Sequence, residues 1–433
     1  MTLLELAELR VTPAELDYLR STCPYLSPSY LSFLEKLRLQ PSEQVNLSFT
    51  PVEDNNEPHD VGDVHISIHG RWLETILYEI PLLALTSEAY FKFGDTDWNH
   101  DGQEEKAYTK AIQLLEHGCA FSEFGTRRRR DYHTMELVMQ GLTRAAATAK
   151  EEGYSGSLSG TSNVHFAMRY GIPPVGTVAH EWFMGIASIS NDYLHASETA
   201  LRYWVGCFGE GVLGIALTDT FGTPTFLKAF KKHMPNIGEA EAKAESVTVP
   251  RPEAPRPAIL DGGVVNNMNH TDFDKLEDTQ KHQKTKTFAE TFKGVRQDSG
   301  DPLEFVNLMR KFYVEQDIKD KKSIVFSDSL NVDKCIQYKT AAEDAGFNAA
   351  FGIGTFFTND FNNLGTDTKS TPLNIVIKLS SASGRPAIKI SDNIGKNTGD
   401  EKTVHQVKEE LGYVEKDWEE GDESKRWDGE VKA

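Results

Sequence analysis

Residues Gly118–Arg127 read GCAFSEFGTR, a short apolar run that ends in a polar turn containing glycine. Seven later segments repeat this pattern of an apolar run followed by polar or glycine residues. The eight runs end in EFGTR (123–127), GTSN (160–163), GTVAH (176–180), LTD (217–219), VRQD (295–298), SDS (327–329), GIGT (352–355) and VIK (376–378). Most are separated by a helical pattern, as in Met135, Val138, Met139 and Leu142.

Eight strand-like segments with reactive residues at their ends predict an α/β fold of the (β/α)8-barrel type, whose active sites form at the carboxyl ends of the strands. An open doubly wound sheet also binds ligands at strand ends. Spacing alone does not separate the two arrangements.

The flanking sequence predicts a domain organisation of three parts. Residues 1–117 are expected to form a smaller α/β domain, residues 118–400 the barrel, and residues 401–433 a charged tail. In the first part, Thr12 and Glu15 form a potential capping box. Val64–His69 alternates like a strand, and Arg71–Tyr90 is expected to be one long helix with Leu73, Ile76, Leu77 and Ile80 on one side.

Residues 236–290 interrupt the barrel pattern. Four prolines (250, 252, 255 and 257) stand close together there, and large apolar residues are few. We expect a disordered insertion in a surface connection.

Composition limits the class of function. The 433 residues include 46 basic and 65 acidic ones, a net charge of −19, which disfavours nonspecific binding to nucleic acid or to anionic membranes. The four cysteines are widely spaced and favour a reducing compartment over disulfides or a zinc site. The N-terminus does not resemble a secretory signal, and no apolar run reaches the roughly 20 residues of a membrane span. We therefore expect a cytoplasmic protein, with the nucleus as a second location.

Arg127–Arg130 is a run of four arginines. A bare run of this kind is often a solvated surface or a nuclear-import patch. Here the run follows Gly125 and opens an amphipathic helix, which suits the binding of phosphate or carboxylate by one or two of the arginines.

Three further turns could bind phosphate. In GTSN, Ser162 is either a helix N-cap or a contact to a phosphate or ring. The glycines before Thr355 allow backbone amides to approach a phosphate, and barrels often place a phosphate site after the seventh and eighth strands. By this count Gly354 lies in the seventh turn and Ser327 in the sixth.

Residues 295–302, VRQDSGDP, combine Arg296, Asp298 and Asp301 within six positions. Such a set could bind an anion, ribose hydroxyls and Mg²⁺ together, because magnesium takes one or two carboxylates plus substrate phosphate oxygens. A simple turn with Asp and Gly caps is the alternative.

His180 ends the GTVAH segment just before a helix. A lone histidine is more often structural than catalytic, and no HExxH motif accompanies it. As a neutral imidazole it could be a base, or a nucleophile toward a phosphoryl group.

The chain resembles the nicotinate phosphoribosyltransferase family in seven motifs that occur in the family's order. They are FSEFGTRRRRDYHTMELVMQGL, GTSNVHFAMRYGIPPVGTVAHEWFMG, LGIALTDTFGT, GVRQDSGDP, FSDSLNV, FGIGT and PLNIVIKL. The resemblance covers about residue 10 to the C-terminus, outside the insertion. It implies an irregular α/β barrel with a smaller N-terminal domain, and a homodimer with active sites at the subunit interface.

The resemblance also implies the reaction. Nicotinate, phosphoribosyl pyrophosphate, ATP and water would give nicotinate mononucleotide, pyrophosphate, ADP and phosphate, a step of NAD salvage, with Mg²⁺ present. His180 matches the histidine that ATP phosphorylates. Arg296 and Thr177 are expected near nicotinate, and Arg127 at its carboxylate or at the phosphoribosyl diphosphate. Asp298 and Asp301 are expected at ribose hydroxyls or magnesium, Gly354 and Thr355 at the 5-phosphate, and Asp219 at the pocket floor.

One departure concerns the start of the chain. Family members begin with a segment containing Asp-x-Tyr-Lys, whose tyrosine stacks on the pyridine ring, and MTLLELAELR contains no such motif. We therefore expect an incomplete N-terminal domain and a nicotinate site that lacks one wall. The alternatives are an inactive member that binds phosphoribosyl pyrophosphate and ATP, a relative acting on nicotinamide or quinolinate, and an aldolase-type barrel with Lys378 as its Schiff-base lysine.

Overall fold

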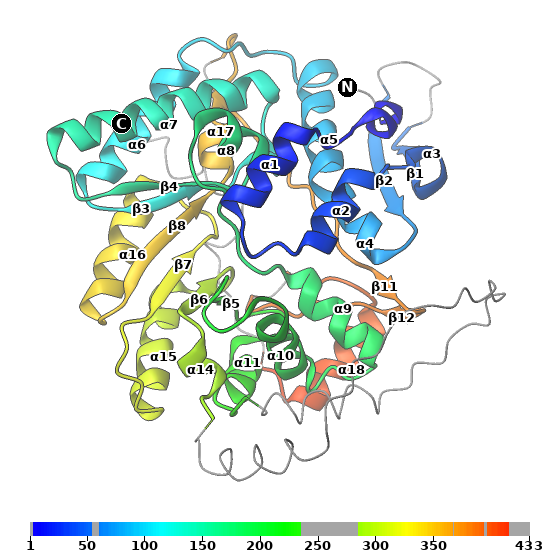
Figure 1. Ribbon diagram of the computed structural model, residues 1–433. Helices are drawn as coiled ribbons and strands as arrows, with labels where there is room; N and C mark the ends of the chain where they lie inside the picture. Colours follow the sequence, from blue (N-terminus) through cyan, green and yellow to red (C-terminus); the bar gives the residue numbers. More distant parts are fainter. Residues whose placement is uncertain (1–2, 54–59, 235–284, 367, 394–395, 415–433) are drawn as a thin grey trace, which may run out of the picture.

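The computed structural model describes residues 3–53, 60–234, 285–366, 368–393 and 396–414. Its centre is a sheet of six parallel strands in the order β4-β3-β8-β7-β6-β5 (Figure 1). The strands are β3 (Ala120–Glu123), β4 (Ser157–Thr161), β5 (Ile215–Leu217), β6 (Gly294–Gln297), β7 (Ser323–Phe326) and β8 (Asn348–Ile353). Short parallel strands joined by helices place every strand's carboxyl end at one edge of the sheet.

Helices follow the strands and cover the sheet. They are α7 (Tyr132–Glu152), α8 (Val164–Tyr170), α9 (His180–Ser190), α10 (Ala196–Phe208), α11 (Thr223–Phe230), α14 (Phe288–Thr291), α15 (Pro302–Glu315), α16 (Val332–Asp344) and α17 (Thr355–Thr358). In α7, Asp131 caps the first turn by accepting from the Thr134 amide at 2.6 Å. The helix ends at Gly153, whose φ of 74° suits glycine. The predicted apolar stripe at 135, 138, 139 and 142 is fully buried, which confirms that prediction.

Two of the eight expected strands are not strands. Residues 173–175 run beside β4, where the Thr161 amide donates to Pro173 and the Val175 amide donates to Thr161, but the segment up to His180 makes no ladder. Residues 376–378 lie outside the sheet, because Ile377 packs on the core of the N-terminal domain. The α/β barrel-type fold is therefore irregular.

The N-terminal domain contains an antiparallel pair, β1 (Val45–Pro51) and β2 (Gly62–Ile68). Its helices are η1 (Leu4–Glu8), α1 (Pro13–Thr22), α2 (Pro28–Lys36), α3 (Pro41–Gln44), α4 (Trp72–Thr75), η2 (Ile76–Tyr78) and α5 (Glu79–Phe93). A small core holds Leu6, Leu39, Val45, Tyr78 and Leu82. The capping box of Thr12 and Glu15 is present, as predicted.

The expected single helix over 71–90 is wrong, because a 3₁₀ turn divides it. At this turn Tyr78 points inward, where its hydroxyl donates to Gln44 at 2.8 Å and accepts from the Gln40 amide at 2.7 Å. Tyr78 is completely buried, and the side that carries Leu73, Ile76 and Ile80 is exposed instead.

The remaining elements show where the other sequence boundaries fall. Helix α6 (Gln103–Glu116) packs on α7 and contributes Ala107, Ala111, Leu114 and Leu115 to the main core, although it precedes the predicted boundary at 117. Residues 401–411, expected in the tail, form helix α18 (Glu401–Leu411) with Val404 and Val407 buried. Of the predicted insertion, 236–284 lies outside the described residues, whereas residues 285–290 lead into and form part of α14.

Two small strand pairs complete the fold. Strand β9 (Phe361–Asn362) pairs with β10 (Lys369–Ser370), and β11 (Ser381–Ala382) with β12 (Arg385–Pro386). No helix in the described ranges combines the length and the apolar character needed to cross a membrane.

Candidate active site

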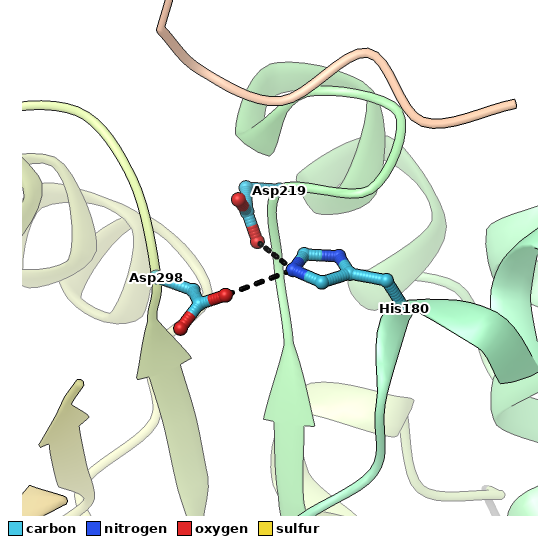
Figure 2. A group of neighbouring side chains, drawn as sticks. All are labelled: His180, Asp219 and Asp298. Carbon is cyan, nitrogen blue, oxygen red and sulfur yellow. Dashed lines mark hydrogen bonds and ion pairs between the residues drawn. The ribbon is translucent and has the colours of Figure 1, made fainter. Parts of the chain in front are cut away.

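His180 is the first residue of α9 and is almost completely buried at the carboxyl edge of the sheet. Its Nε2 lies 2.9 Å from Oδ2 of Asp298 and 3.9 Å from Oδ1 of Asp219 (Figure 2). Its Nδ1 lies 3.0 Å from the hydroxyl of Thr220. Both ring nitrogens are therefore occupied, so the ring orientation is fixed by residues that follow β5 and β6.

Burial controls the charge of this imidazole. Burial and the nearby Lys389 ammonium lower the pKa of His180, the two aspartates raise it in part, and the net result is a pKa of about 4. For Asp298, burial alone would raise the pKa, but the Arg296 guanidinium and the hydrogen bond from His180 hold it well below its usual range. Near pH 7 the site therefore contains a neutral imidazole beside an ionised carboxylate.

The neutral ring has one N–H to place. Asp298 is ionised and can only accept, so Nε2 carries the proton and donates to it. Nδ1 then holds the lone pair and accepts a hydrogen bond from the Thr220 hydroxyl. Nδ1 is therefore the ring nitrogen with a lone pair that could act as a base or as a nucleophile.

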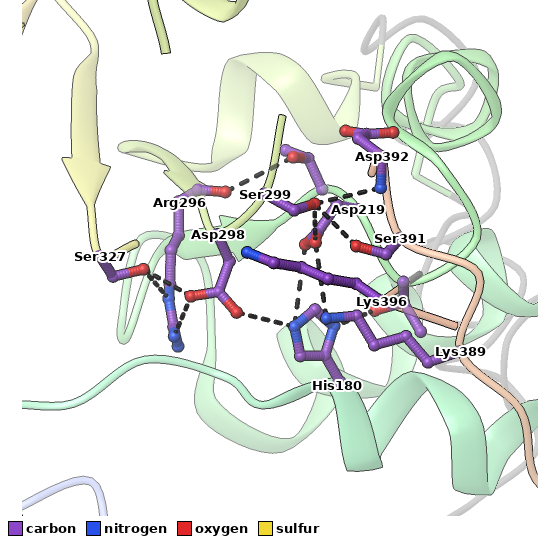
Figure 3. Close-up of polar contacts among 12 residues, drawn as sticks. His180, Asp219, Arg296, Asp298, Ser299, Ser327, Lys389, Ser391, Asp392 and Lys396 are labelled. Carbon is purple, nitrogen blue, oxygen red and sulfur yellow. Dashed lines mark hydrogen bonds and ion pairs between the residues drawn. The ribbon is translucent and has the colours of Figure 1, made fainter. Parts of the chain in front are cut away.

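Arg296, on β6, is held in place by three side chains. Its Nε donates to Ser327 at 2.7 Å and its Nη2 to Asp298 at 2.5 Å (Figure 3). Its Nη1 donates to Thr177 at 3.0 Å. Ser327 also donates to Asp298 at 2.7 Å. Three residues predicted from separate turns are therefore brought around one guanidinium, at the ends of β6 and β7 and beside the segment that leads to His180.

Asp219 lies behind His180 and is 1% exposed. Its Oδ2 accepts from Ser299 at 2.6 Å and lies 3.7 Å from Lys389, whereas its buried Oδ1 has no hydrogen-bond partner in the described structure. Burial opposes ionisation of Asp219, but the positive charge possible on His180 and that of Lys389 lower its pKa.

Sequence reasoning missed Thr220, Ser299 and Lys389. Thr220 and Ser299 each directly follow a predicted site aspartate, so their position beside Asp219 and Asp298 was an available signal. Lys389 lies in a segment without regular structure, and no local pattern marks it.

The four arginines have different environments. Arg130 is fully buried, with its guanidinium 3.6 Å from the centre of the Phe91 ring and 4.2 Å from that of Phe361. Arg128 donates to the carbonyl of Ile375 at 3.2 Å, and Arg129 lies 3.8 Å from a carboxylate oxygen of Glu88. Within the described part of the chain, Arg127 has no such hydrogen-bond or ion-pair partner and is half-buried. Arg127 is therefore the arginine available to a ligand.

The glycine turns shape the strand ends. A Cβ on Gly352 would lie 2.5 Å from the Phe124 ring, and one on Gly125 would lie 2.2 Å from the Thr358 hydroxyl. These glycines let the loop before Arg127 pack closely against β8 and the short helix α17. Gly354 and the buried Thr355 stand at that start, at the carboxyl end of β8.

Two predicted turn residues lie at the beginnings of helices. The N-cap of α8 is Asn163, which accepts from the Phe166 amide, and the side chain of Ser162 is exposed. Asp301 caps α15 by accepting from Leu303 and Glu304 amides at 2.7 and 3.1 Å. Asp301 is not part of the group His180, Asp219 and Asp298, whose ligand atoms lie within 4.8 Å of one another.

Glu123, at the end of β3, is a buried carboxyl that the sequence did not single out. It accepts from Thr161 at 2.6 Å and from the Gly125 amide. Burial raises its pKa to about 7, although both hydrogen bonds oppose the shift. It ties the loop before Arg127 to the end of β4.

The fold and the site define an α/β enzyme whose polar groups gather around a buried neutral histidine at the carboxyl edge of parallel strands. Residues 119–238 and 266–415 match the nicotinate phosphoribosyltransferase (NAPRTase) family, and residues 2–87 match the N-terminal domain of that family. The chain therefore belongs to the nicotinate phosphoribosyltransferase family of ATP-dependent enzymes.

Similar proteins agree with this assignment. The chain is 44% identical over 407 residues to the nicotinate phosphoribosyltransferase of Saccharomyces cerevisiae, covering 93% of this chain and 81% of that protein. It is 42% identical over 408 residues to the probable nicotinate phosphoribosyltransferase of Schizosaccharomyces pombe, covering 94% and 84%. The crystal structure of a putative nicotinate phosphoribosyltransferase from Saccharomyces cerevisiae superposes with a TM-score of 0.79 at 43% identity, covering 95% and 86%. The crystal structure of nicotinate phosphoribosyltransferase from Porphyromonas gingivalis superposes with a TM-score of 0.72 at 29% identity, covering 95% of this chain and 87% of that one. The resemblance in the sequence is thus confirmed, and the aldolase alternative based on Lys378 is excluded.

Proposed function

We propose that this chain converts nicotinate and phosphoribosyl pyrophosphate to nicotinate mononucleotide and pyrophosphate, with hydrolysis of one ATP to ADP and phosphate. The observation that carries the proposal is the pairing of a neutral, buried His180 with the ionised Asp298, which is also bound to Arg296. Relatives named nicotinate phosphoribosyltransferase and probable nicotinate phosphoribosyltransferase support the same reaction.

His180 is the residue that ATP phosphorylates. Its Nδ1 lone pair attacks the γ-phosphorus, an N–P bond forms, and the bond from phosphorus to the bridging oxygen breaks as ADP leaves. Asp298 accepts a hydrogen bond from Nε2–H. Its negative charge stabilises the positive charge that the ring gains when Nδ1 is phosphorylated. Water later attacks the phosphorus and releases inorganic phosphate, which restores the neutral imidazole.

Arg296 and Thr177 bind nicotinate, together with Arg127. The guanidinium of Arg296 is fixed by Ser327, Thr177 and Asp298, so it is oriented before substrate arrives. Arg127 is unpaired in the described structure and suits the nicotinate carboxylate or the diphosphate. A cationic site distinguishes nicotinate from nicotinamide, which has no negative charge.

The phosphoribosyl group binds along the same edge. Gly354 and Thr355 lie at the end of β8 and would cradle the 5-phosphate, and Asp298 would accept from ribose hydroxyls. Ser162 is exposed at the end of β4, which β3 separates from β8, and would contact the same ligand. Nicotinate's ring nitrogen attacks the ribosyl carbon, and pyrophosphate leaves with the electron pair of the broken C–O bond.

Mg²⁺ fits this donor set. Asp219 offers a buried carboxylate oxygen without a partner, and Asp298 offers a second carboxylate close by. These two would hold the ion. Asp301 caps α15 through Oδ1 only, so its Oδ2 would be left to reach the same ion through substrate or water. When bound with pyrophosphate, magnesium would neutralise the charge of the leaving group.

A homodimer in the cytoplasm completes the proposal, with the nucleus as a second location. Leu47, Phe49 and Val64 of β1 and β2 are exposed, as are Leu73, Ile76 and Ile80 beside them in sequence. Exposed apolar residues in this number within one small domain suit an interface with a second copy. All four cysteines are unpaired, which agrees with a reducing compartment.

The test is to incubate the purified chain with phosphoribosyl pyrophosphate, Mg²⁺ and either nicotinate, nicotinamide or quinolinate, with and without ATP. We expect a mononucleotide product only in the incubations with nicotinate, and we expect its rate of formation to rise with ATP. Product from nicotinamide, or no product from any of the three, would overturn the proposal.

A further inference from the structure

Trp72, the first residue of α4, connects the N-terminal domain to helix α9. Its Nε1 donates to Oε1 of Glu181 at 2.6 Å. Its ring stacks on that of Trp182, with ring centres 6.1 Å apart and planes at 23°. Glu181 and Trp182 are the second and third residues of α9, so the indole contacts the first turn of this helix directly.

Helix α9 is also shaped to receive this indole. A Cβ on Gly185 would lie 2.3 Å from the six-membered ring of Trp72. Since Gly185 has a backbone conformation that any residue can adopt, its glycine serves the close approach of the ring. Residues 181, 182 and 185 thus form a continuous contact surface for Trp72 on one side of α9.

The same turn carries His180. Nδ1 and Nε2 of that ring each have a single hydrogen-bond partner, at 3.0 and 2.9 Å, and both partners lie on other elements. A small rotation of the first turn of α9 would move the ring away from Thr220 and Asp298 at once. The position of Glu181, one residue further along, is therefore linked to that of His180.

Glu181 is in a half-buried, electrostatically crowded place. Burial raises the pKa of Glu181 and Glu79 raises it further, whereas the hydrogen bond from Trp72 and the charge of Lys378 lower it. Trp72 is the neutral donor that steadies this carboxylate, and it comes from a different domain.

We propose that Trp72 and Glu181 are positioning residues through which the N-terminal domain fixes the first turn of α9, and so sets the angle at which His180 attacks ATP. This inference rests on the proposed function. It assigns to the N-terminal domain a part in phosphoryl transfer by a contact that does not touch the substrate.

The experiment compares four variants with the wild-type chain. W72F keeps an aromatic ring but removes the donor, E181A removes the acceptor, E181Q keeps an acceptor oxygen, and the double variant W72F/E181A removes both. W204F is the matched control. Trp204 also packs against the ring of Trp182, but its Nε1 donates to the Leu213 carbonyl at 3.1 Å and not to Glu181. The readouts are ATP hydrolysis, phosphohistidine after a short incubation with ATP, and product formed per ATP hydrolysed.

We expect W72F and E181A each to lower kcat for ATP hydrolysis and the phosphohistidine yield about tenfold, with KM for ATP within about twofold, because one charge-assisted hydrogen bond is lost. The double variant should be no worse than either single variant, since both remove one contact. E181Q should recover most of the rate, and W204F should equal the wild type. Near-ultraviolet circular dichroism and thermal unfolding check that each variant is folded.

Three outcomes would overturn the inference alone: wild-type rates in W72F, multiplicative losses in the double variant, or equal losses in W204F. A wild-type chain that forms no nicotinate mononucleotide would overturn the proposed function, and this inference with it.

Discussion

Nε2 of His180 and Oδ2 of Asp298 lie 2.9 Å apart, although 118 positions separate the residues in the chain. One residue begins a helix and the other follows a strand. Because Asp298 also accepts from Arg296, a single carboxylate joins the histidine to a residue proposed to bind nicotinate. Phosphorylation of the ring would therefore change the charge next to the substrate site.

Replacing His180 by alanine should abolish ATP hydrolysis and leave the fold intact. The nucleophilic nitrogen is lost, so synthesis of nicotinate mononucleotide should no longer respond to ATP. Parallel assays of ADP and of the mononucleotide check this, with circular dichroism as the control for folding. ATP-stimulated synthesis by His180→Ala would contradict the assignment of His180.

Asp298→Asn should lower kcat for ATP hydrolysis by at least about a hundredfold, because an amide can present its N–H to His180 and favour the wrong tautomer. Ser327→Ala removes only one of the bonds to Asp298 and should cost far less. Steady-state kinetics of the two variants provide the comparison. Equal losses would show that the charge of Asp298 is not what matters.

The pH dependence of stability should carry the signature of His180. Its pKa is about 4 in the folded chain and near 6.5 when unfolded, so the unfolded state binds more protons between these values. The contribution of neutral His180 to the free energy of unfolding is fully present above pH 6.5 and is lost as pH falls toward 4. Denaturant unfolding of the wild type and of His180→Asn over this range gives the measurement. The wild type should lose stability relative to the variant on acidification, and parallel curves would refute a buried neutral imidazole.

The arginine run should separate into binding and packing roles. Arg130→Lys should lower the free energy of unfolding by about 2 kcal/mol, because lysine cannot stack in the same way between Phe91 and Phe361. Arg127→Lys should leave stability unchanged and raise KM for nicotinate or phosphoribosyl pyrophosphate. Chemical denaturation and kinetics on both variants test this, and a stability loss at Arg127 would contradict it.

Replacing glycine by alanine should have opposite effects on stability at positions 352 and 206. Gly352→Ala places a methyl group 2.5 Å from the Phe124 ring and should destabilise the chain by about 1–3 kcal/mol. Gly206→Ala, within α10, meets nothing within 4 Å and should stabilise it by about 0.5–1 kcal/mol. Thermal unfolding distinguishes these outcomes, and equal effects would remove the packing explanation for Gly352.

Much of the site is predictable from the sequence because parallel strands deliver their carboxyl ends to one edge. This rule alone brings Asp219, Arg296, Asp298 and Ser327 into one region. His180 joins them from the first turn of α9, after a segment that forms no strand. It fails where tertiary packing decides. Lys389 reaches Asp219 from an irregular segment, and Ile377 leaves the barrel for the core of the other domain. The helix over 71–90 is broken because Tyr78 finds partners in and beside α3, which no local periodicity reveals.

The order of the strands has a consequence for synthesis of the chain. Within the sheet β3 pairs with β8, so Ala120 lies opposite Ala350. A nascent chain cannot make this pairing until β8 has left the ribosome, when most of the protein has already been made. Until then one edge of β3 is left without its native neighbour. The sheet must therefore close late, and its folding should be slow and sensitive to chaperones.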